Sequence, residues 1–356
     1  MRILQVVPYL PKASGVTTFV VNSSDEMAKH GIEQVVCVND QMRFMPVLSN
    51  FGVPRISTVE AMKLIREGSV DFVHFHGVWP YFMHKLVKTA KKHNVPYIFS
   101  LHGMLSPVAM NIKRYKKIVA WYAWQRNDLQ GAAALHVTAR MEAKWLEKFN
   151  FGVRVEEIPL GATIPAVIND KNNSHESRVL LFVGRVHRIK ALDNLIVAWS
   201  KVDRRNWKVR IVGSDDGHFM TELKEQTKAL GLEESVCFVG PKFGKDLQLE
   251  YENADCLILP SHSENFGGVV VDALGFGIPA IASKNTPWAL LQEERCGWWT
   301  DNNPEELAKT ITAMMSLSDE ERRAMGLRGR ELVKRDYEWS TIARKVSCMY
   351  EKCLKR

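Results

Sequence analysis

The feature that most constrains the fold is an alternation of short apolar runs with helical patterns, which occurs twice along the chain. In the first half the apolar runs predict strands at 3–7, 35–38, 72–75, 97–101 and 135–137. After an interruption the pattern resumes, and strands are predicted at 179–183, 208–212, 236–239, 256–259 and 280–282. Such alternation is typical of parallel sheets covered by helices on both faces. The predicted fold class is therefore α/β, with two doubly wound Rossmann-like domains.

The interruption is a polar, irregular stretch at 160–177, which is the best candidate for a linker. Because 356 residues exceed what one hydrophobic core usually serves, we expect two domains. We predict an N-terminal domain at 1–163, a linker at 164–177, a C-terminal domain at 178–336 and a final helix at 337–356. An apolar stripe on that helix indicates burial, and its members are Trp339, Ile342, Val346, Met349 and Tyr350.

The stretch from Pro260 to Pro279 carries the strongest chemical signal. Glu264 follows a predicted strand, and Asp272 falls inside the following helix. Between these two carboxylates, Gly267 and Gly268 leave the backbone bare at the start of the helix, where unpaired amides and the helix dipole favour an anion. The stretch therefore predicts a binding site for a sugar and a phosphate, and the alternative is an ordinary strand-to-helix turn.

A second segment, at 182–190, begins as an apolar strand and ends in a basic loop that we expect to be exposed. The loop contains Arg185, His187, Arg188 and Lys190. Arginine offers a planar fork of donors and lysine a compact charge, so Arg185 and Lys190 together suit a diphosphate. The alternative is a basic loop that is simply solvated.

Together these two segments resemble the family 4 retaining glycosyltransferases, whose signature joins an E-x7-E motif to an arginine and a lysine. The matching positions are Glu264, Asp272, Arg185 and Lys190, and the resemblance covers almost the whole chain. The chain departs from the family pattern at Asp272, where glutamate is usual, and at Ala191, where glycine is usual. The resemblance implies the GT-B fold, in which two Rossmann-like domains face each other across a cleft and the final helix crosses back to the first domain.

The resemblance also implies a role for each residue of the motif. Arg185 and Lys190 would stabilise the charge that develops on the diphosphate as the bond to the sugar breaks. Glu264 would bind hydroxyls of the donor sugar, and Asp272 would bind the ribose. The nucleobase would lie by the loop after the strand at 236–239. The residues expected to complete the donor site are Gly15, Asn265, Phe266, Gly267, Gly268, Gly240, Pro241 and Lys242.

Ligands of open α/β sheets collect outside the carboxyl ends of the strands, which makes loops of the N-terminal domain candidates as well. Gly15 follows the first predicted strand and would let the backbone approach a phosphate or sugar, although a lone glycine is also typical of a turn. His102 follows the fourth, and the resemblance makes it a catalytic residue that hydrogen-bonds the reacting sugar. His76 is a weaker candidate, and His74 is predicted to lie in the core.

The net charge of +8 indicates an anionic partner such as a nucleotide sugar, a nucleic acid or an acidic lipid surface. Four cations precede three aromatic residues in one predicted helix, which suggests a face that rests on a membrane. These residues are Lys113, Arg114, Lys116, Lys117, Trp121, Tyr122 and Trp124. The alternative is a charged helix whose aromatic side chains pack inward. Nucleic acid is not an expected partner, because the positive residues are dispersed and no recognised motif is present.

The sequence lacks H-E-x-x-H, a cysteine pair and D-x-D, so we predict a site without a metal, and with no cofactor beyond the nucleotide-sugar substrate. No apolar run approaches the length that crosses a bilayer, and the N-terminus does not form a signal peptide. We therefore expect a cytoplasmic location, with a peripheral contact at the inner face of the plasma membrane left open.

The resemblance predicts transfer of a sugar, with retention, from a nucleoside-diphosphate sugar to a hydroxyl of a glycan or lipid-linked acceptor. Bacterial surface-polysaccharide biosynthesis is the expected context. Two alternatives of the same architecture stay open. One is a sugar-nucleotide 2-epimerase, and the other is a non-catalytic glycan-binding subunit.

Overall fold

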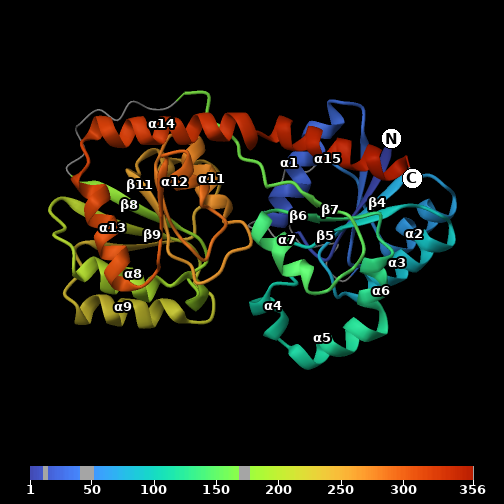
Figure 1. Cartoon of the computed structure of the whole chain (residues 1–356), viewed down its shortest axis with the longest axis horizontal. Helices are drawn as coiled ribbons and strands as arrows, with labels where there is room; N and C mark the ends of the chain where they lie inside the picture. The colour runs from blue at the N-terminus through green and yellow to red at the C-terminus, as the bar shows by residue number, and fades with distance from the viewer. Residues whose placement is uncertain (11–14, 41–51, 168–176, 356) are drawn as a thin grey trace. The chain divides into compact units, whose positions relative to one another are not determined.

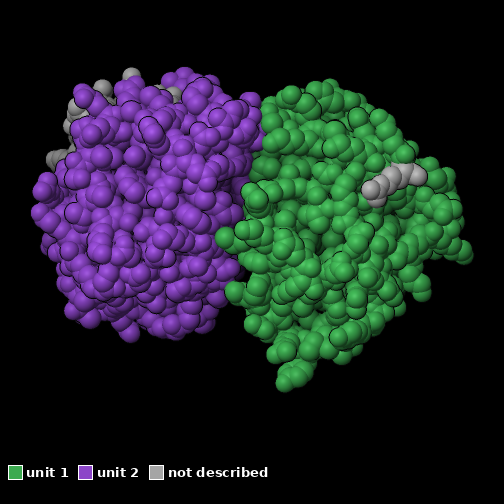
Figure 2. Space-filling model, in the orientation of Figure 1, with its two compact units in different colours: residues 1–161, 339–356 green, residues 162–338 purple. Residues whose placement is uncertain are grey.

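The computed structural model describes residues 1–10, 15–40, 52–167 and 177–355. The chain forms two compact units, coloured separately in Figure 2. Unit 1 comprises Met1–Gly161 and Trp339–Arg356, and unit 2 comprises Ala162–Glu338. Residues 162–163 and 337–338 thus belong to unit 2, whereas the sequence placed them with the N-terminal domain and the final helix. Of the predicted linker, 168–176 lie outside the described residues.

Unit 1 is built on a seven-stranded parallel sheet in the order β3-β2-β1-β4-β5-β6-β7 (Figure 1). Its strands are β1 (Arg2–Val7), β2 (Glu33–Val38), β3 (Arg55–Ile56), β4 (Phe72–His76), β5 (Tyr97–Ser100), β6 (Ala134–Val137) and β7 (Val155–Glu157). The chain runs outward in one direction from β1 to β3 and in the other from β4 to β7. The topological switch point, where such sheets bind ligands, therefore lies between β1 and β4.

Helices cover both faces of this sheet. They are α1 (Gly15–Ala28), α2 (Thr58–Arg66), α3 (Tyr81–Lys92), α4 (Pro107–Asn111), α5 (Arg114–Ala120), the π-turn η2 (Trp121–Gln125), α6 (Arg126–Gln130), α7 (Arg140–Glu147) and α15 (Trp339–Leu354). On one face α1 and α15 pack on a core that includes Phe19, Phe72 and Ile342. On the other face α2 and α3 bury Ile65 and Leu86 against the sheet. The final helix is thus part of the core of unit 1.

Unit 2 contains a six-stranded parallel sheet in the order β10-β9-β8-β11-β12-β13. Its strands are β8 (Arg178–Val183), β9 (Trp207–Val212), β10 (Val236–Gly240), β11 (Cys256–Leu259), β12 (Ala280–Ser283) and β13 (Gly297–Thr300). The chain adds strands outward from β8 to β10 on one side and from β11 to β13 on the other. The pair β8 and β11 is therefore the switch point of unit 2. The prediction of two doubly wound α/β sheets is confirmed, and each of the ten predicted strands is present with its ends shifted by two residues at most.

The helices of unit 2 follow its strands in alternation. They are the 3-10 turn η3 (Arg188–Lys190), α8 (Leu192–Ser200), α9 (Phe219–Ala229), α10 (Gly244–Glu252), α11 (Gly268–Gly275), α12 (Leu290–Glu293), α13 (Pro304–Ser316) and α14 (Asp319–Asp336). The start of α14 is fixed by a capping box between Ser318 and Glu321. Gly326 lets α14 approach the turn after α11, because a Cβ there would lie 1.8 Å from the carbonyl oxygen of Gly277.

Candidate functional site

The switch point of unit 2 joins the two motifs that the sequence singled out. Lys190 follows β8 and Glu264 follows β11, and their side chains form an ion pair between Nζ and Oε1 although they are 74 positions apart. The two side chains are only 15% and 13% exposed. The expectation of a wholly exposed basic loop is wrong for Lys190, whereas the side chains of Arg185 and Arg188 are 65% and 66% exposed.

Backbone contacts hold Lys190 in place. The backbone N–H of Lys190 donates to the carbonyl of His187 (2.8 Å), and Nδ1 of His187 accepts from the N–H of Ile189 (3.1 Å). The N–H of His262, after β11, donates to the carbonyl of Ile189 (2.8 Å), which ties η3 to the loop that carries Glu264. Ala191 then adopts a left-handed conformation (φ +50°), which is costly for alanine and explains why glycine is favoured there.

The loop that carries Glu264 is fixed from two sides. Ser261 Oγ donates to Oε1 of Glu264 (2.7 Å), and the N–H of Glu264 donates to the carbonyl of Asn285 (3.4 Å). Phe266 is buried against Trp288, whose indole N–H donates to the carbonyl of Phe266 (2.6 Å). The carboxylate is therefore positioned by groups that are themselves held by the core.

Two glycines begin α11 immediately after this loop. Gly267 is left-handed (φ +78°), and a Cβ on it would lie 2.8 Å from Cδ2 of Leu259. A Cβ on Gly268 would meet no described atom within 4 Å. No side chain of the described residues caps the helix, so its first backbone amides are presented beside Glu264 and Asn265.

Arg185 has a carboxylate partner that sequence reasoning missed. Its Nη1 lies 2.5 Å from Oδ2 of Asp216, and the Asp216 side chain is 43% exposed. The neighbouring Asp215 accepts from the N–H of Met220, in the first turn of α9 (3.1 Å). Ser261 was likewise missed. Asp216 follows β9, and β9 lies next to β8, which brings Asp216 close to Arg185. This neighbourhood can be recognised only when the strand order is known.

Asp272 lies in α11 and is half-buried. Burial raises the pKa of its carboxyl to about 7. Tyr251 of α10 is buried, and its pKa is raised by burial and by the charge of Asp272. At neutral pH the Asp272 carboxyl is thus divided between its neutral and charged forms.

The loop predicted to lie by the nucleobase follows β10. Gly240 is left-handed (φ +83°), and its carbonyl accepts from the N–H of Gly213 at the end of β9 (3.0 Å). Pro241 is exposed and Lys242 is half-buried. These three residues therefore lie at the same edge of the sheet as Lys190, beyond the intervening strand β9.

In unit 1 the two predicted residues again follow strands near the switch point. Gly15 begins α1 after β1 and is exposed. His102 follows β5 in a left-handed conformation (φ +49°), and its Nε2 lies 3.1 Å from Nδ1 of His76. Burial lowers the pKa of His102 to about 3, so its imidazole is neutral at ordinary pH. His74 is fully buried, as predicted.

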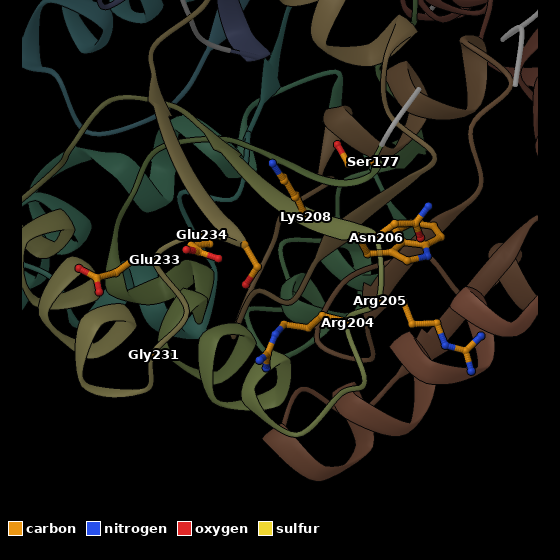
Figure 3. A pocket seen from close by; sticks show the side chains of 10 residues that line it. Ser177, Arg204, Arg205, Asn206, Lys208, Gly231, Glu233 and Glu234 are labelled. Carbon is orange, nitrogen blue, oxygen red and sulfur yellow. The ribbon is translucent and has the colours of Figure 1, made fainter. Parts of the chain in front are cut away.

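A hollow of about 900 Å³ lies at the opposite edge of the unit 2 sheet (Figure 3). Its lining includes Trp207 and Lys208, which begin β9, and Ser235, which precedes β10. It contains none of the predicted donor residues. Because open α/β sheets bind ligands at the carboxyl ends of their strands, this hollow is a poor candidate for the donor site.

Two features are absent from the part of the chain that the structure describes. No three His, Cys, Asp or Glu side chains there are placed to hold a metal ion. The helices there are also too short or too polar to span a bilayer.

Comparison with known proteins places this chain in a family. The model for Glycosyltransferase Family 4 matches residues 12–163, and that for Glycosyl transferases group 1 matches 164–332. An uncharacterized glycosyltransferase of Haemophilus influenzae is 29% identical over 185 residues, which cover 51% of this chain and 50% of that protein. A D-inositol 3-phosphate glycosyltransferase of Salinispora tropica is 31% identical over 186 residues, 48% of this chain and 38% of that protein. The chain thus spans half or less of the length of these relatives.

Solved structures match over the whole length. A glycosyltransferase of Rickettsia africae has a TM-score of 0.80 at 19% identity and covers 100% of this chain and 99% of its own. Anabaena Alr3699/HepE in complex with UDP has a TM-score of 0.79 at 16% identity and covers 99% and 100%. The fold is therefore that of the GT-B glycosyltransferases. From its two matching models, the chain belongs to glycosyltransferase family 4.

Proposed function

We propose that this chain is a retaining glycosyltransferase that moves a sugar from a nucleoside-diphosphate sugar to a hydroxyl of a glycan or lipid-linked acceptor, in the synthesis of a bacterial surface polysaccharide. The observation that carries the proposal is the meeting of Lys190 and Glu264 at the switch point of unit 2. The Anabaena structures with UDP and UDP-glucose support such a donor. A lipopolysaccharide outer core galactosyltransferase of the same fold supports the acceptor class.

The proposed role of the cations is to offset the negative charge that grows on the diphosphate as its bond to the sugar breaks. Lys190 is mostly buried and is held by η3, so its ammonium is positioned before any substrate arrives. Among the described residues, the carboxylate that pairs with Arg185 is that of the partly exposed Asp216. Such a surface pair contributes little stability, so a phosphate could replace Asp216 at small cost.

The proposed role of Glu264 is to accept hydrogen bonds from hydroxyls of the donor sugar. Its Oε1 is engaged by Lys190 and Ser261. Among the described residues nothing donates to its Oε2, which leaves that oxygen for a sugar hydroxyl. The amides of Asn265, Phe266 and Gly267, together with the N-terminus of α11 at Gly268, would bind further oxygens of the donor.

The remaining roles follow the resemblance. Asp272 binds the ribose, the loop at Gly240, Pro241 and Lys242 faces the nucleobase, and His102 and Gly15 contribute from unit 1. Attack occurs on the face from which the diphosphate leaves, and the departing phosphate oxygen accepts the proton of the acceptor. A second catalytic carboxylate, as in glycosidases, is not part of this scheme. The proposal includes no metal and no cofactor.

A peripheral membrane contact is also proposed, through an exposed surface of α5 and η2. Tyr115, Val119 and Tyr122 are 86%, 67% and 75% exposed. The cations nearest to them in the sequence, Lys113, Arg114 and Lys116, are exposed as well. The structure supports both expectations for the aromatic residues of this helix. Tyr122 is exposed, as a membrane-facing surface requires, whereas Trp121 packs inward on Phe149 (4.9 Å between ring centroids). Figure 1 shows α4 and α5 set apart from the sheet of unit 1. The basic-aromatic patch consists of Lys113, Arg114, Tyr115, Lys116, Val119 and Tyr122.

The test is a transfer assay with a panel of nucleoside-diphosphate sugars, each with and without glycan and lipid-linked acceptors. Proton NMR would follow release of the nucleoside diphosphate and the anomeric configuration of the product. We expect release that depends on the acceptor and a product with the configuration of the donor. An inverted product would contradict retention, and conversion of the donor without an acceptor would indicate an epimerase. Binding without turnover across the panel would indicate a glycan-binding subunit.

A further inference from the structure

The core of unit 1 contains a row of polar side chains at positions that are normally apolar in a parallel sheet. The row crosses the central strands on the face covered by α1 and α15, and each member is at most 6% exposed. Ser24 of α1 and Tyr350 of α15 complete it and are also buried. From β2 to β6 its members are Gln34, Gln5, His74, His76, Ser100 and His136.

One branch of the network starts at a backbone carbonyl, which can only accept. Nε2 of Gln34 donates to the carbonyl of Ser24 (3.2 Å), and this fixes the orientation of the Gln34 amide. Oε1 of Gln34 therefore accepts from Nε2 of Gln5 (2.8 Å). Oε1 of Gln5 in turn accepts from Nε2 of His76 (2.7 Å). In neutral His76 the proton is thus on Nε2, and Nδ1 is a bare acceptor.

A second branch starts at another carbonyl, that of Ile158. Nε2 of His136 donates to this carbonyl (2.7 Å), so Nδ1 of His136 accepts from the hydroxyl of Ser100 (2.5 Å). Because the Ser100 hydroxyl gives its proton to His136, it accepts from Nε2 of His74 (2.6 Å). Nδ1 of His74 is then also a bare acceptor.

The two branches meet at Gln5. The hydroxyl of Tyr350 donates to Nδ1 of His74 (2.6 Å) and therefore accepts from Nε2 of Gln5 (3.2 Å). This is the same orientation of the Gln5 amide that the first branch requires. The orientation of the Gln5 amide is consequently determined twice, from the backbone carbonyls of Ser24 and Ile158, whereas each other hydrogen bond takes its direction from one of these two carbonyls.

His102 lies at the end of this network. Its Nε2 is 3.1 Å from Nδ1 of His76, and since that nitrogen is bare, Nε2 of His102 must be the donor. Nδ1 of neutral His102 then carries no proton, and among the described residues it has no hydrogen-bond partner. Burial lowers the pKa of His74, His76, His102 and His136 alike, which keeps these rings neutral. Phe19 of α1 packs against all four rings, at 5.4 to 6.5 Å between centroids.

We propose that this network sets the tautomer of His102, so that His102 meets the substrate as a hydrogen-bond acceptor through Nδ1. Gln34, Gln5 and His76 are its positioning residues. The identity of the group that His102 meets rests on the proposed function: a sugar hydroxyl can donate to a bare Nδ1, whereas a phosphate or carbonyl oxygen cannot. The network thus selects for a hydroxyl before any substrate binds.

The first test measures the tautomer in the protein without substrate. Long-range proton–nitrogen NMR spectra of the chain labelled with ¹⁵N in its histidine rings distinguish protonated from bare ring nitrogens. The His102 signals are those lost in His102→Asn. We expect Nε2 protonated and Nδ1 bare at pH 7. A proton on Nδ1, or a mixture of the two tautomers, would overturn the proposal whether or not the chain transfers sugar.

Variants then test the cause. Gln5→Leu removes the acceptor of the His76 proton, and we expect His102 to become a mixture of tautomers. Tyr350→Phe is the matched control, because the branch through Gln34 still orients Gln5, and the tautomer should be unchanged. If Gln5→Leu does not fold, Gln34→Leu combined with Tyr350→Phe removes both anchors of the Gln5 amide. An unchanged tautomer in that double variant or in Gln5→Leu would overturn the proposal.

The last arm uses donor analogues in which each sugar hydroxyl is replaced in turn by hydrogen or by fluorine, which cannot donate. At the position that His102 contacts, both replacements should lower kcat/KM by about tenfold, the loss expected for one hydrogen bond. His102→Leu should abolish this difference between analogue and parent. Retained activity with the fluorine analogue, together with a loss for the hydrogen analogue, would contradict the acceptor role. Absence of transfer by the wild-type chain would contradict only the proposed function.

Discussion

Replacement of Asp272 by asparagine should stabilise the protein above neutral pH. Burial in α11 raises the pKa of this carboxyl from 3.8 to about 7. In the unfolded chain the group returns to its ordinary pKa. Between about pH 4 and pH 7 the folded protein therefore holds a proton that the unfolded chain has lost, and the stability of the wild type falls as pH rises through this window. D272N has no such group and escapes this loss.

The size of the effect follows from the shift. A difference of about 3 pKa units corresponds to roughly 4 kcal/mol, which is reached near pH 8. At pH 5 about 1.5 kcal/mol has already been lost, so the change between pH 5 and pH 8 is about 2.5 kcal/mol. Because the residue is only half-buried, these are upper values.

Urea denaturation of wild type and D272N at pH 5 and pH 8 measures this difference directly. The matched control is Glu225→Gln, which makes the same carboxyl-to-amide exchange at an exposed position of α9 in the same unit. We expect the advantage of D272N over wild type to grow with pH, and that of the control to stay constant. An advantage of D272N that does not change with pH would refute the reasoning.

Three further predictions concern the backbone, the charges and the membrane contact. Gly267→Ala should cost about 1–3 kcal/mol in thermal unfolding, because it strains a left-handed residue and crowds its neighbour, whereas Gly268→Ala should change stability by less than about 1 kcal/mol. Arg185→Ala and Lys190→Ala should each lower kcat by about 10²- to 10³-fold in steady-state assays, and Lys208→Ala, at the opposite edge of the sheet, should not. Replacing the three cations of the basic-aromatic patch by glutamine should lower the affinity for anionic vesicles, measured by flotation, by about 100-fold, at about 1 kcal/mol per charge. Equal flotation of the variant and the wild type would contradict the proposed membrane contact.

The central strands could be predicted because they are buried on both faces and therefore appear as continuous apolar runs. The three strands that the sequence analysis missed all lie at sheet edges: β3 and β7 in unit 1 and β13 in unit 2. Val155–Glu157 contains two glutamates, and Arg55–Ile56 is only two residues long. At an edge one side of the strand lacks a partner and burial is weaker, so the apolar signal fades in β3 and β7.

The candidate site was predictable only in part. Lys190 and Glu264 each follow an apolar strand, and the type of residue and its position were enough to single them out. Asp216 and Ser261 need the strand order and the loop contacts before they acquire a meaning. The polar network of unit 1 was out of reach for a different reason: alternation shows which side chains share a face, but the direction of a hydrogen bond depends on distances between named atoms.

The central claim is that unit 2 binds a nucleoside diphosphate through Arg185 and Lys190. Isothermal titration of the chain with UDP, GDP and ADP measures this most directly. We predict saturable binding of at least one of them at one site. The double variant R185A/K190A should bind at least about 100-fold more weakly, since two charged contacts are lost, and K208A should bind as the wild type does. Binding of none of the three, or equal binding by wild type and R185A/K190A, would contradict the claim.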